Sequence, residues 1–343
     1  FIDKKISILS RSLKQDLILN TVINEENKIH IDGQLIGELK GLKFTIELTS
    51  KTLDTDIKSI KKAARKGVKE ELNKRVYDII SNGDISVNLD GKLIWKNYPI
   101  ARLKKGHDYL TPEIEVLADE SLELEAMSRL DKFLKEWLKN YIDHILGDLI
   151  NLTKKETKNQ YLRALVFQLY EKNGVIKRNE IENIVKLIPS EERKKLWGMG
   201  IKIGRYHIYL PKMLKPKAVE FRVSLWKIFN NLKNNEQIPK FGLNFIINKD
   251  YEKNFLLLCG FEKFKDFFVR IDILEKLFIK ILDNTKERKF KINAEMMNLL
   301  GCTKENFYTL MKYMNYKKDK AEDTYIFKGE RKKTDKFLKF DKK

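Results

Sequence analysis

Residues 28–40 read KIHIDGQLIGELK, and residues 92–104 read KLIWKNYPIARLK. The two stretches match at a constant offset, so that Ile29 corresponds to Leu93, 64 positions further along. A fixed offset between similar apolar patterns indicates an internal repeat. The same offset relates the remaining apolar pairs, which are Ile31 and Trp95, Ile36 and Ile100, and Leu39 and Leu103.

Each copy of this repeat has the pattern of a β-hairpin. Apolar and polar residues alternate on both sides of a two-residue turn, which is Asp32-Gly33 in the first copy and Lys96-Asn97 in the second. Alternation with a period of two indicates strands, and Asp-Gly is a dipeptide that favours a tight hairpin turn. The sequence therefore predicts two hairpins.

A further strand and a long amphipathic helix follow each predicted hairpin. The strands are expected at 44–48 and 114–117, and each helix has apolar residues at every fourth position. One such unit has too little core to be stable alone. We therefore expect residues 25–150 to form two tandem β-hairpin–helix units that pack together. The helix faces are Val68, Leu72 and Val76 in the first unit, and Phe133, Trp137 and Tyr141 in the second.

The rest of the chain has a different organisation. Residues 151–249 are expected to be a helical middle domain, with Ser190 capping one helix and a Gly/Pro-marked hairpin after Gly198. Residues 250–328 show helix, Gly turn, helix and hairpin, the outline of a winged helix, with caps expected at Asn293 and Thr303 and a turn at Gly301. We expect residues 1–24 to end an upstream helical domain and residues 329–343 to be a basic flexible tail. The predicted fold class is α+β and predominantly helical.

Composition points to a polyanionic partner. The chain carries 69 Lys and Arg against 49 Asp and Glu, a net charge of +20. Such an excess favours a polyanionic partner, which could be RNA, DNA or an anionic membrane surface, although many lysines only solvate a surface. Two cysteines, Cys259 and Cys302, exclude a disulfide framework and indicate the cytoplasm of a cell. No apolar run reaches the roughly 18 residues that span a bilayer, so no membrane partner is expected.

The sequence shows none of the common catalytic motifs. A phosphate-binding loop is absent, because the glycines at 198, 200 and 204 lack the Lys-Ser/Thr that would follow. The four histidines have no His, Cys or Glu at metal-ligand spacing, and the carboxylates form no distinct cluster. We therefore predict no catalytic residue, no metal site and no cofactor in these residues.

Three groups of basic residues are candidate nucleic-acid contacts. The first group follows one face of a helix. The second group combines basic and aromatic side chains, which can pair with the phosphates and stack on the bases of a single strand. The alternatives are a solvated face for the first group, core aromatics with a solvated rim for the second, and a satisfied surface or core histidine at His207. The candidates are Lys58, Lys61, Lys62, Arg65 and Lys69; then Arg205, Tyr206, His207, Lys212, Lys215 and Lys217; and finally Lys304 and Lys312.

Four stretches resemble Suv-three-like superfamily-two helicases of the mitochondrial RNA-degradosome type, and mainly their alphaproteobacterial relatives. They are residues 1–9 (FIDKKISIL), 91–122 (GKLIWKNYPIARLKKGHDYLTPEIEVLADESL), 198–226 (GMGIKIGRYHIYLPKMLKPKAVEFRVSLW) and 260–316, which begins GFEKFKDFFVRIDILEKLF. The third is the strongest match. The resemblance implies a parent that couples ATP and Mg²⁺ chemistry to unwinding, with its motifs N-terminal to Phe1, so no catalytic residue carries over.

Four functions are compatible with these patterns. The first is a non-catalytic C-terminal accessory region of an ATP-dependent helicase, which grips nucleic acid or orients the helicase core in the same chain. Because residue 1 is Phe and not Met, we expect a fragment of a longer protein. The others are a stand-alone nucleic-acid-binding protein, a scaffold docking a nuclease or ribosomal partner through the hairpins, and a metal-dependent nuclease.

Overall fold

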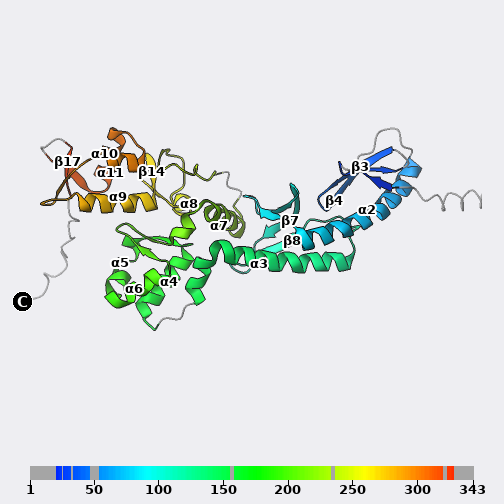
Figure 1. The fold of residues 1–343 in the computed structure, drawn as a ribbon, viewed down its shortest axis with the longest axis horizontal. Coiled ribbons are helices and arrows are strands. Elements are labelled where there is room, and N and C mark those ends of the chain that lie inside the picture. Colours follow the sequence, from blue (N-terminus) through cyan, green and yellow to red (C-terminus); the bar gives the residue numbers. More distant parts are fainter. Residues whose placement is uncertain are drawn as a thin grey trace, which may run out of the picture. The chain divides into compact units, whose positions relative to one another are not determined.

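The computed structural model describes residues 21–24, 26–31, 34–46, 54–154, 158–232, 236–319 and 323–327. The chain is mixed α+β, and its described strands form five small antiparallel sheets (Figure 1). Backbone contacts divide it into two compact units. The first is Phe1–His144 with Ser224–Asn234, and the second is Ile145–Val223 with Asn235–Lys343.

The first unit contains two four-stranded sheets, and a long helix follows each. Both sheets have their strands in chain order. The first comprises β1 (Thr21–Ile23), β2 (Lys28–Ile31), β3 (Gln34–Lys40) and β4 (Lys43–Ile46), followed by α2 (Asp54–Asn82). The second comprises β5 (Ile85–Val87), β6 (Lys92–Trp95), β7 (Tyr98–Lys104) and β8 (Glu113–Val116), followed by α3 (Leu124–Lys154).

The hairpins of the two sheets also pair in the same register. Ile29 lies opposite Gly37, and Leu93 lies opposite Ala101. The register shifts directly after Ile29 in one hairpin and directly after Leu93 in the other. Strands β6 and β7 pair as predicted, and both turn residues, Lys96 and Asn97, have positive φ of 45° and 66°. The corresponding turn, Asp32-Gly33, lies outside the described residues.

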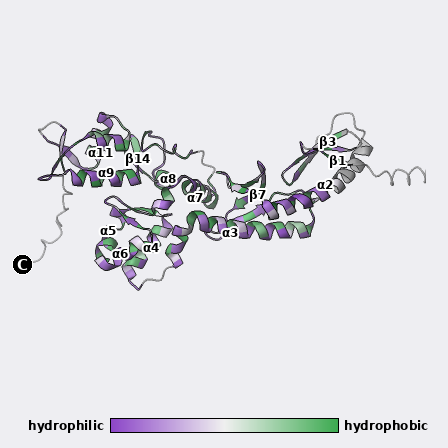
Figure 2. Cartoon of the chain, in the orientation of Figure 1, coloured by the Kyte–Doolittle hydropathy of each residue, from purple (hydrophilic) through white to green (hydrophobic). Residues whose placement is uncertain are grey.

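The long helices bury aliphatic faces. Val68, Leu72 and Val76 of α2 are buried, as the sequence predicted. The prediction for α3 was wrong, because its aromatic row is only partly buried and a neighbouring aliphatic row forms the core. Hydrophobic and hydrophilic residues alternate along α3 (Figure 2). Both rows repeat every fourth residue, so periodicity alone could not choose between them. The buried row is Leu130, Leu134, Leu138 and Ile142, and the partly buried row is Phe133, Trp137 and Tyr141.

The two sheets of the first unit touch through the turn between β3 and β4. The Asp119 N–H donates to the Leu42 carbonyl at 2.8 Å, and the buried Arg75 donates to the Gly41 carbonyl at 2.8 Å. Gly41 has φ +59°, and a Cβ there would lie 3.0 Å from the Tyr98 Cβ. Glycine therefore permits both the turn and the close approach.

From Gln160 onward, three consecutive segments share one order of elements: a helix, a strand, one or two helices, and two strands. Segment A contains α4 (Gln160–Glu171), β9 (Val175–Lys177), α5 (Glu182–Leu187), α6 (Ser190–Gly198), β10 (Lys202–Ile203) and β11 (His207–Tyr209). Segment B contains α7 (Pro216–Phe229), β12 (Phe245–Ile247), α8 (Lys253–Leu258), β13 (Phe261–Lys263) and β14 (Phe267–Arg270). Segment C contains α9 (Ile271–Asp283), β15 (Lys289–Lys291), α10 (Ala294–Leu300), α11 (Lys304–Tyr313), β16 (Tyr316–Lys318) and β17 (Thr324–Phe327).

The three segments also share their strand order. The sheets run β9-β11-β10, β12-β14-β13 and β15-β17-β16, so the last strand of each segment lies between the other two. Each pairing is antiparallel. Among the described residues, segment B has one helix between its first strand and its hairpin, where segments A and C have two.

Helix ends in segment C follow their sequence signals. Asn293 accepts a hydrogen bond from the Met296 N–H at 2.9 Å, and Thr303 accepts one from the Asn306 N–H at 3.3 Å. Gly301 closes α10 with φ +67°. In segment A the prediction of a Ser190 cap was wrong: α6 already includes Ser190, and Pro189 precedes it without a side-chain hydrogen bond.

No helix among the described residues combines the length and apolarity that a lipid bilayer would require. The domain boundaries predicted at residues 25, 151, 250 and 329 stay predictions. The first sheet begins at Thr21, ahead of the first of them.

Arg222 forms hydrogen bonds with three backbone carbonyl groups from different parts of the second unit. Its side chain is 0% exposed, and its guanidinium donates to the carbonyls of Asn173 (2.6 Å), Leu258 (2.9 Å) and Met213. Asn173 follows α4 and Leu258 ends α8. One side chain thus satisfies backbone acceptors that fall where regular structure stops.

We expect Arg222→Met to lower the free energy of unfolding by roughly 3 kcal/mol, because buried carbonyls lose charge-assisted donors. Chemical denaturation of the full chain measures the change. Lys217→Met, at an exposed position of the same helix, is the matched control and should stay within about 0.5 kcal/mol of the parent. A loss no larger than the control's would contradict this role for Arg222.

Candidate functional site

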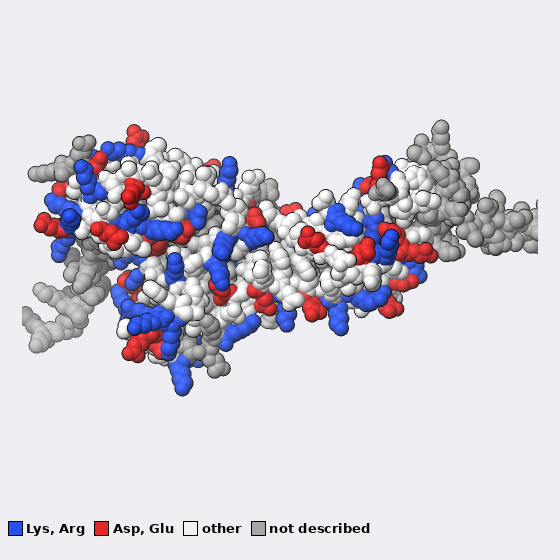
Figure 3. Space-filling view, viewed as in Figure 1, with Lys and Arg blue, Asp and Glu red and all other residues white. Residues whose placement is uncertain are grey.

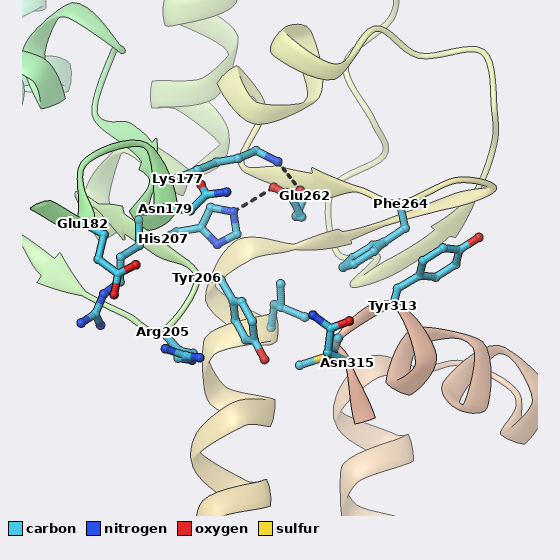
Figure 4. Close-up of a pocket in the computed structure, with 13 residues that line it drawn as sticks. Lys177, Asn179, Glu182, Arg205, Tyr206, His207, Glu262, Phe264, Tyr313 and Asn315 are labelled. Carbon is cyan, nitrogen blue, oxygen red and sulfur yellow. Dashed lines mark hydrogen bonds and ion pairs between the residues drawn. The ribbon is translucent and has the colours of Figure 1, made fainter. Parts of the chain in front are cut away.

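Segments A, B and C meet around one pocket of the second unit, a half-open hollow of about 240 Å³ (Figure 4). We call it the three-segment pocket. Segment A contributes its first strand end and the β10–β11 hairpin, segment B its β13–β14 hairpin, and segment C its first helix and the end of α11. The lining residues are Lys177, Arg178, Asn179, Glu182, Arg205, Tyr206 and His207; Glu262 and Phe264; and Leu274, Tyr313, Met314 and Asn315.

Aromatic rings line one side of this pocket. Phe264 and Tyr313 lie together with ring centroids 5.9 Å apart and planes inclined at 38°. Tyr313 is 39% exposed, so part of its ring is open to solvent. Arg205 and Glu182 lie on the opposite side, and Tyr206 lies between (Figure 4). The pocket thus has an aromatic wall facing a charged one.

Behind the charged wall, His207 bridges two carboxylates. Its ring is 1% exposed, and Nε2 lies 2.9 Å from Glu262 Oε2. Nδ1 lies 3.4 Å from Glu275 Oε1, which is ion-pair distance without the alignment of a directed hydrogen bond. Glu262 also pairs with Lys177. These four residues, the His207 network, join β9 and β11 of segment A to β13 of segment B and α9 of segment C.

Glu275 shapes the backbone that forms the pocket's edge. Its carboxylate accepts three consecutive N–H groups, from Arg205 (2.6 Å), Tyr206 (2.8 Å) and His207 (2.8 Å). Gly204 permits this approach, because a Cβ there would lie 2.3 Å from the carboxyl carbon of Glu275. The buried charge is therefore matched by converging donors, as a buried carboxylate requires.

The same environment sets the protonation of His207. Burial disfavours the charged ring and lowers its pKa, but the hydrogen bond to Glu262 and the negative charges of Glu262 and Glu275 outweigh burial and raise the pKa above 6.5. The pKa of Glu262 is correspondingly lowered: burial raises it, and the stronger combined effect of His207 and Lys177 lowers it. Both partners therefore favour a charged pair.

The structure brings together two of the predicted binding residues and buries a third nearby. Arg205 and Tyr206 line the three-segment pocket, each partly exposed. His207 is buried against carboxylates, which matches the satisfied core histidine that the sequence left open as its alternative. Phe264, Tyr313 and Asn315 were not anticipated, because nothing in their local sequence marks them.

The predicted lysines fall into three classes. Lys69, Lys212 and Lys304 each form an ion pair, with Glu123 (2.9 Å), Asp148 (2.9 Å) and Asp323 (2.7 Å) respectively. Lys215, Lys217 and Lys312 are exposed, and within the described part of the chain they form no ion pair. Lys58, Lys61, Lys62 and Arg65 fall within α2, but their side chains lie outside the described residues.

Helix α6 carries a basic and aromatic surface that the sequence analysis missed. Lys194 and Lys195 are exposed, and Trp197 is 79% exposed. A second hollow lies beside Trp197 and includes Gly200 and Lys212. On the face drawn, Lys and Arg side chains gather over the lobe that contains α5 and α6, whereas elsewhere they alternate with Asp and Glu (Figure 3). The stretch ERKKLWG was the available signal.

The cysteines and the possible metal ligands at the described positions are alternative candidates for a site of chemistry. Burial raises the pKa of the Cys302 thiol to about 11, which opposes formation of a reactive thiolate. Cys259 is buried. Within the described ranges, no group of three or more His, Cys, Asp or Glu side chains is arranged to hold a metal ion.

Comparison with known proteins finds no matching family model, no matching curated protein and no matching solved structure. The resemblance to helicase C-terminal regions therefore stays a prediction.

The raised pKa of His207 gives a pH dependence with a defined sign. A folded pKa above 6.5 means that the stabilisation is complete below pH 6.5 and is lost as pH rises through the folded value. We expect the free energy of unfolding to fall over that range in the parent chain and to fall less in His207→Gln, as measured by denaturation at a series of pH values.

NMR titration of the His207 ring provides an independent check. Glu262→Gln removes one facing carboxylate and should lower the His207 pKa relative to the parent chain. Lys135→Gln, at an exposed α3 position paired with Asp131, is the matched control and should leave it unchanged. A His207 ring that titrates below pH 6.5 in the parent chain would refute the charged-pair interpretation.

Proposed function

We propose that this chain binds nucleic acid through segments A, B and C, as a non-catalytic accessory region of an ATP-dependent helicase. One observation carries the proposal: a helix, a strand, one or two helices and a hairpin recur three times in succession, each with its last strand in the centre of the sheet, and segments A and C have the two helices of a winged helix. Helix, strand, helix, helix and hairpin is the outline of a winged helix. Winged helices belong to the helix-turn-helix class, in which the second helix of the pair contacts nucleic acid.

Helices α6 and α11 occupy that second-helix position in segments A and C. The side chains on α6 suit the role best, because the exposed Lys194 can pair with phosphates and Trp197 offers a face for stacking, whereas Lys195 already pairs with Glu192 at 2.6 Å. On α11, Lys312 is exposed and Lys304 is held by Asp323. We therefore assign the main phosphate contact to α6.

Charge supports the same assignment. A net charge of +20 gives the chain a long-range attraction for a polyanion, and phosphate contacts then release counterions. Because acidic side chains are interspersed with basic ones over much of the face in Figure 3, the charge is not one continuous stripe. Binding is thus expected at discrete sites that several segments contribute.

The first unit has a separate role in this proposal. Its two sheets share strand order and register at an offset of 64 positions, which supports a duplicated hairpin–helix unit. We assign it to orienting the helicase core of the parent chain or docking a nuclease or ribosomal partner. ATP and Mg²⁺ would act in that core and not in these residues.

Protein docking is the second candidate function for segment A. The observation that favours it is Trp197, since a tryptophan 79% exposed on a helix is a common interface anchor. Under this alternative the lysines around it would form a solvated rim. The two candidates differ in whether charge on α6 controls binding of an oligonucleotide.

We expect Lys194→Glu with Lys195→Glu to weaken binding of a single-stranded oligonucleotide by at least tenfold. The variant should also flatten the dependence of log affinity on log salt, by about 0.7 for each phosphate that the chain no longer neutralises. Fluorescence anisotropy of the full chain with labelled RNA and DNA at several salt concentrations measures both effects, and shows which nucleic acid is preferred.

The matched control is a double reversal in the first unit, Lys132→Glu with Lys139→Glu, at two exposed positions of α3. It changes net charge equally and should leave affinity within about threefold of the parent chain. Retained affinity and salt slope in the α6 variant would favour docking over nucleic-acid binding. Absence of any salt-dependent binding by the parent chain would refute the proposed function itself.

A further inference from the structure

We propose that the three-segment pocket takes one unpaired nucleobase from a bound strand. The proposal rests on the nucleic-acid binding proposed above and names the part of the ligand that this pocket recognises. Four properties of the pocket support it: its aromatic wall, its amide groups, its guanidinium groups and its size.

The aromatic wall provides a stacking surface. Tyr313 presents its partly exposed ring, and Phe264 supports that ring from the side at 5.9 Å between centroids. Phe267 packs edge-on against Tyr313 at 5.9 Å, which holds the ring in place. A base can stack on such a fixed ring whatever its identity, because every base has a π-face.

Two amide side chains stand at the edge of the same hollow. Asn179 and Asn315 line the pocket, and both are at least partly exposed. An amide offers both a donor and an acceptor, which matches the mixed donor and acceptor edges of unpaired bases. Asn315 has φ +64°, a conformation that asparagine tolerates better than most residues. The turn from α11 to β16 thus places an amide beside the stacking ring.

The opposite wall can receive a phosphate. Arg178 donates to the Gly204 carbonyl at 2.8 Å, and its Nε is buried with no hydrogen-bond partner among the described residues. The two carboxylates that line the pocket already have cationic partners: Glu262 pairs with Lys177 and His207, and Glu182 pairs with Lys186 at 3.2 Å. The guanidinium of Arg178 therefore gives this wall a positive charge.

The size of the pocket limits the occupant. A volume of about 240 Å³ is below the roughly 300–1,000 Å³ of pockets for drug-sized ligands, so it suits one planar base and not a base pair. A base can enter only when it is unstacked and unpaired. This selects a single strand, a bulge or a strand end.

The test uses the full chain and a short single strand containing one 2-aminopurine, whose fluorescence changes when the base stacks on an aromatic ring. We expect binding to quench the probe, and Tyr313→Ala to abolish the quenching and weaken affinity by about tenfold. Tyr313→Phe keeps the ring and should retain both. Tyr77→Ala, at a 70% exposed tyrosine of α2, is the matched control and should leave both unchanged.

Asn315→Gly removes the amide while glycine tolerates the positive φ, so it tests base recognition without backbone strain. We expect it to reduce discrimination among oligonucleotides that differ at one base while quenching persists. RNA and DNA versions of each strand show which sugar is accepted.

Two results distinguish a failure of the pocket proposal from a failure of the proposed nucleic-acid binding. Salt-dependent binding by the parent chain, with quenching and affinity unchanged in Tyr313→Ala, would overturn the pocket proposal and leave the proposed function standing. No binding of any strand by the parent chain would overturn both. Circular dichroism of each variant verifies that a lost signal does not come from unfolding.

Discussion

The carboxylate of Glu275 is the constraint on which the second unit's geometry depends. It accepts three successive backbone N–H groups from Arg205 to His207. A buried charge costs several kcal/mol unless donors converge on it, so the β10–β11 hairpin of segment A and helix α9 of segment C must keep this arrangement. Gly204 is needed because any Cβ there would collide with the carboxylate.

His207 extends this constraint to segment B. Its ring lies between Glu275 and Glu262, and Lys177 supplies a positive charge to Glu262. When His207 is protonated, two cations and two carboxylates nearly neutralise one another in a buried site, which is the condition under which such a cluster can persist. Arg222 acts similarly on neutral groups, since its guanidinium satisfies carbonyls left over where α4 and α8 end. Polar side chains, as well as apolar packing, fix how the segments meet.

Sequence reasoning succeeded where the determinants are local. The caps at Asn293 and Thr303 and the glycine at 301 each act within one turn of chain, so α10 and α11 could be located from sequence alone. The three-residue strands β9 and β12 were missed, because strands that short form only by pairing with distant partners. The pocket could not be predicted for the same reason, because its residues are distant in sequence. Glu275 lies 70 positions from Arg205, and no periodicity connects Tyr313 or Phe264 to Tyr206. Basic and aromatic composition marked Arg205 and Tyr206, but it could not show that His207 faces inward.

Binding of a base in the three-segment pocket, as proposed above, would depend on the arrangement of the segments. A base that contacts segments A, B and C at once binds only the arrangement in which all three line the pocket, so by linkage it must stabilise that arrangement. The His207 network stabilises the same arrangement through charge. Protonation of His207 and occupation of the pocket therefore act on one equilibrium, and each should strengthen the other by the same free energy. A strand held in this way would fix the orientation of three tandem segments through a single inserted base, without a separate contact on each.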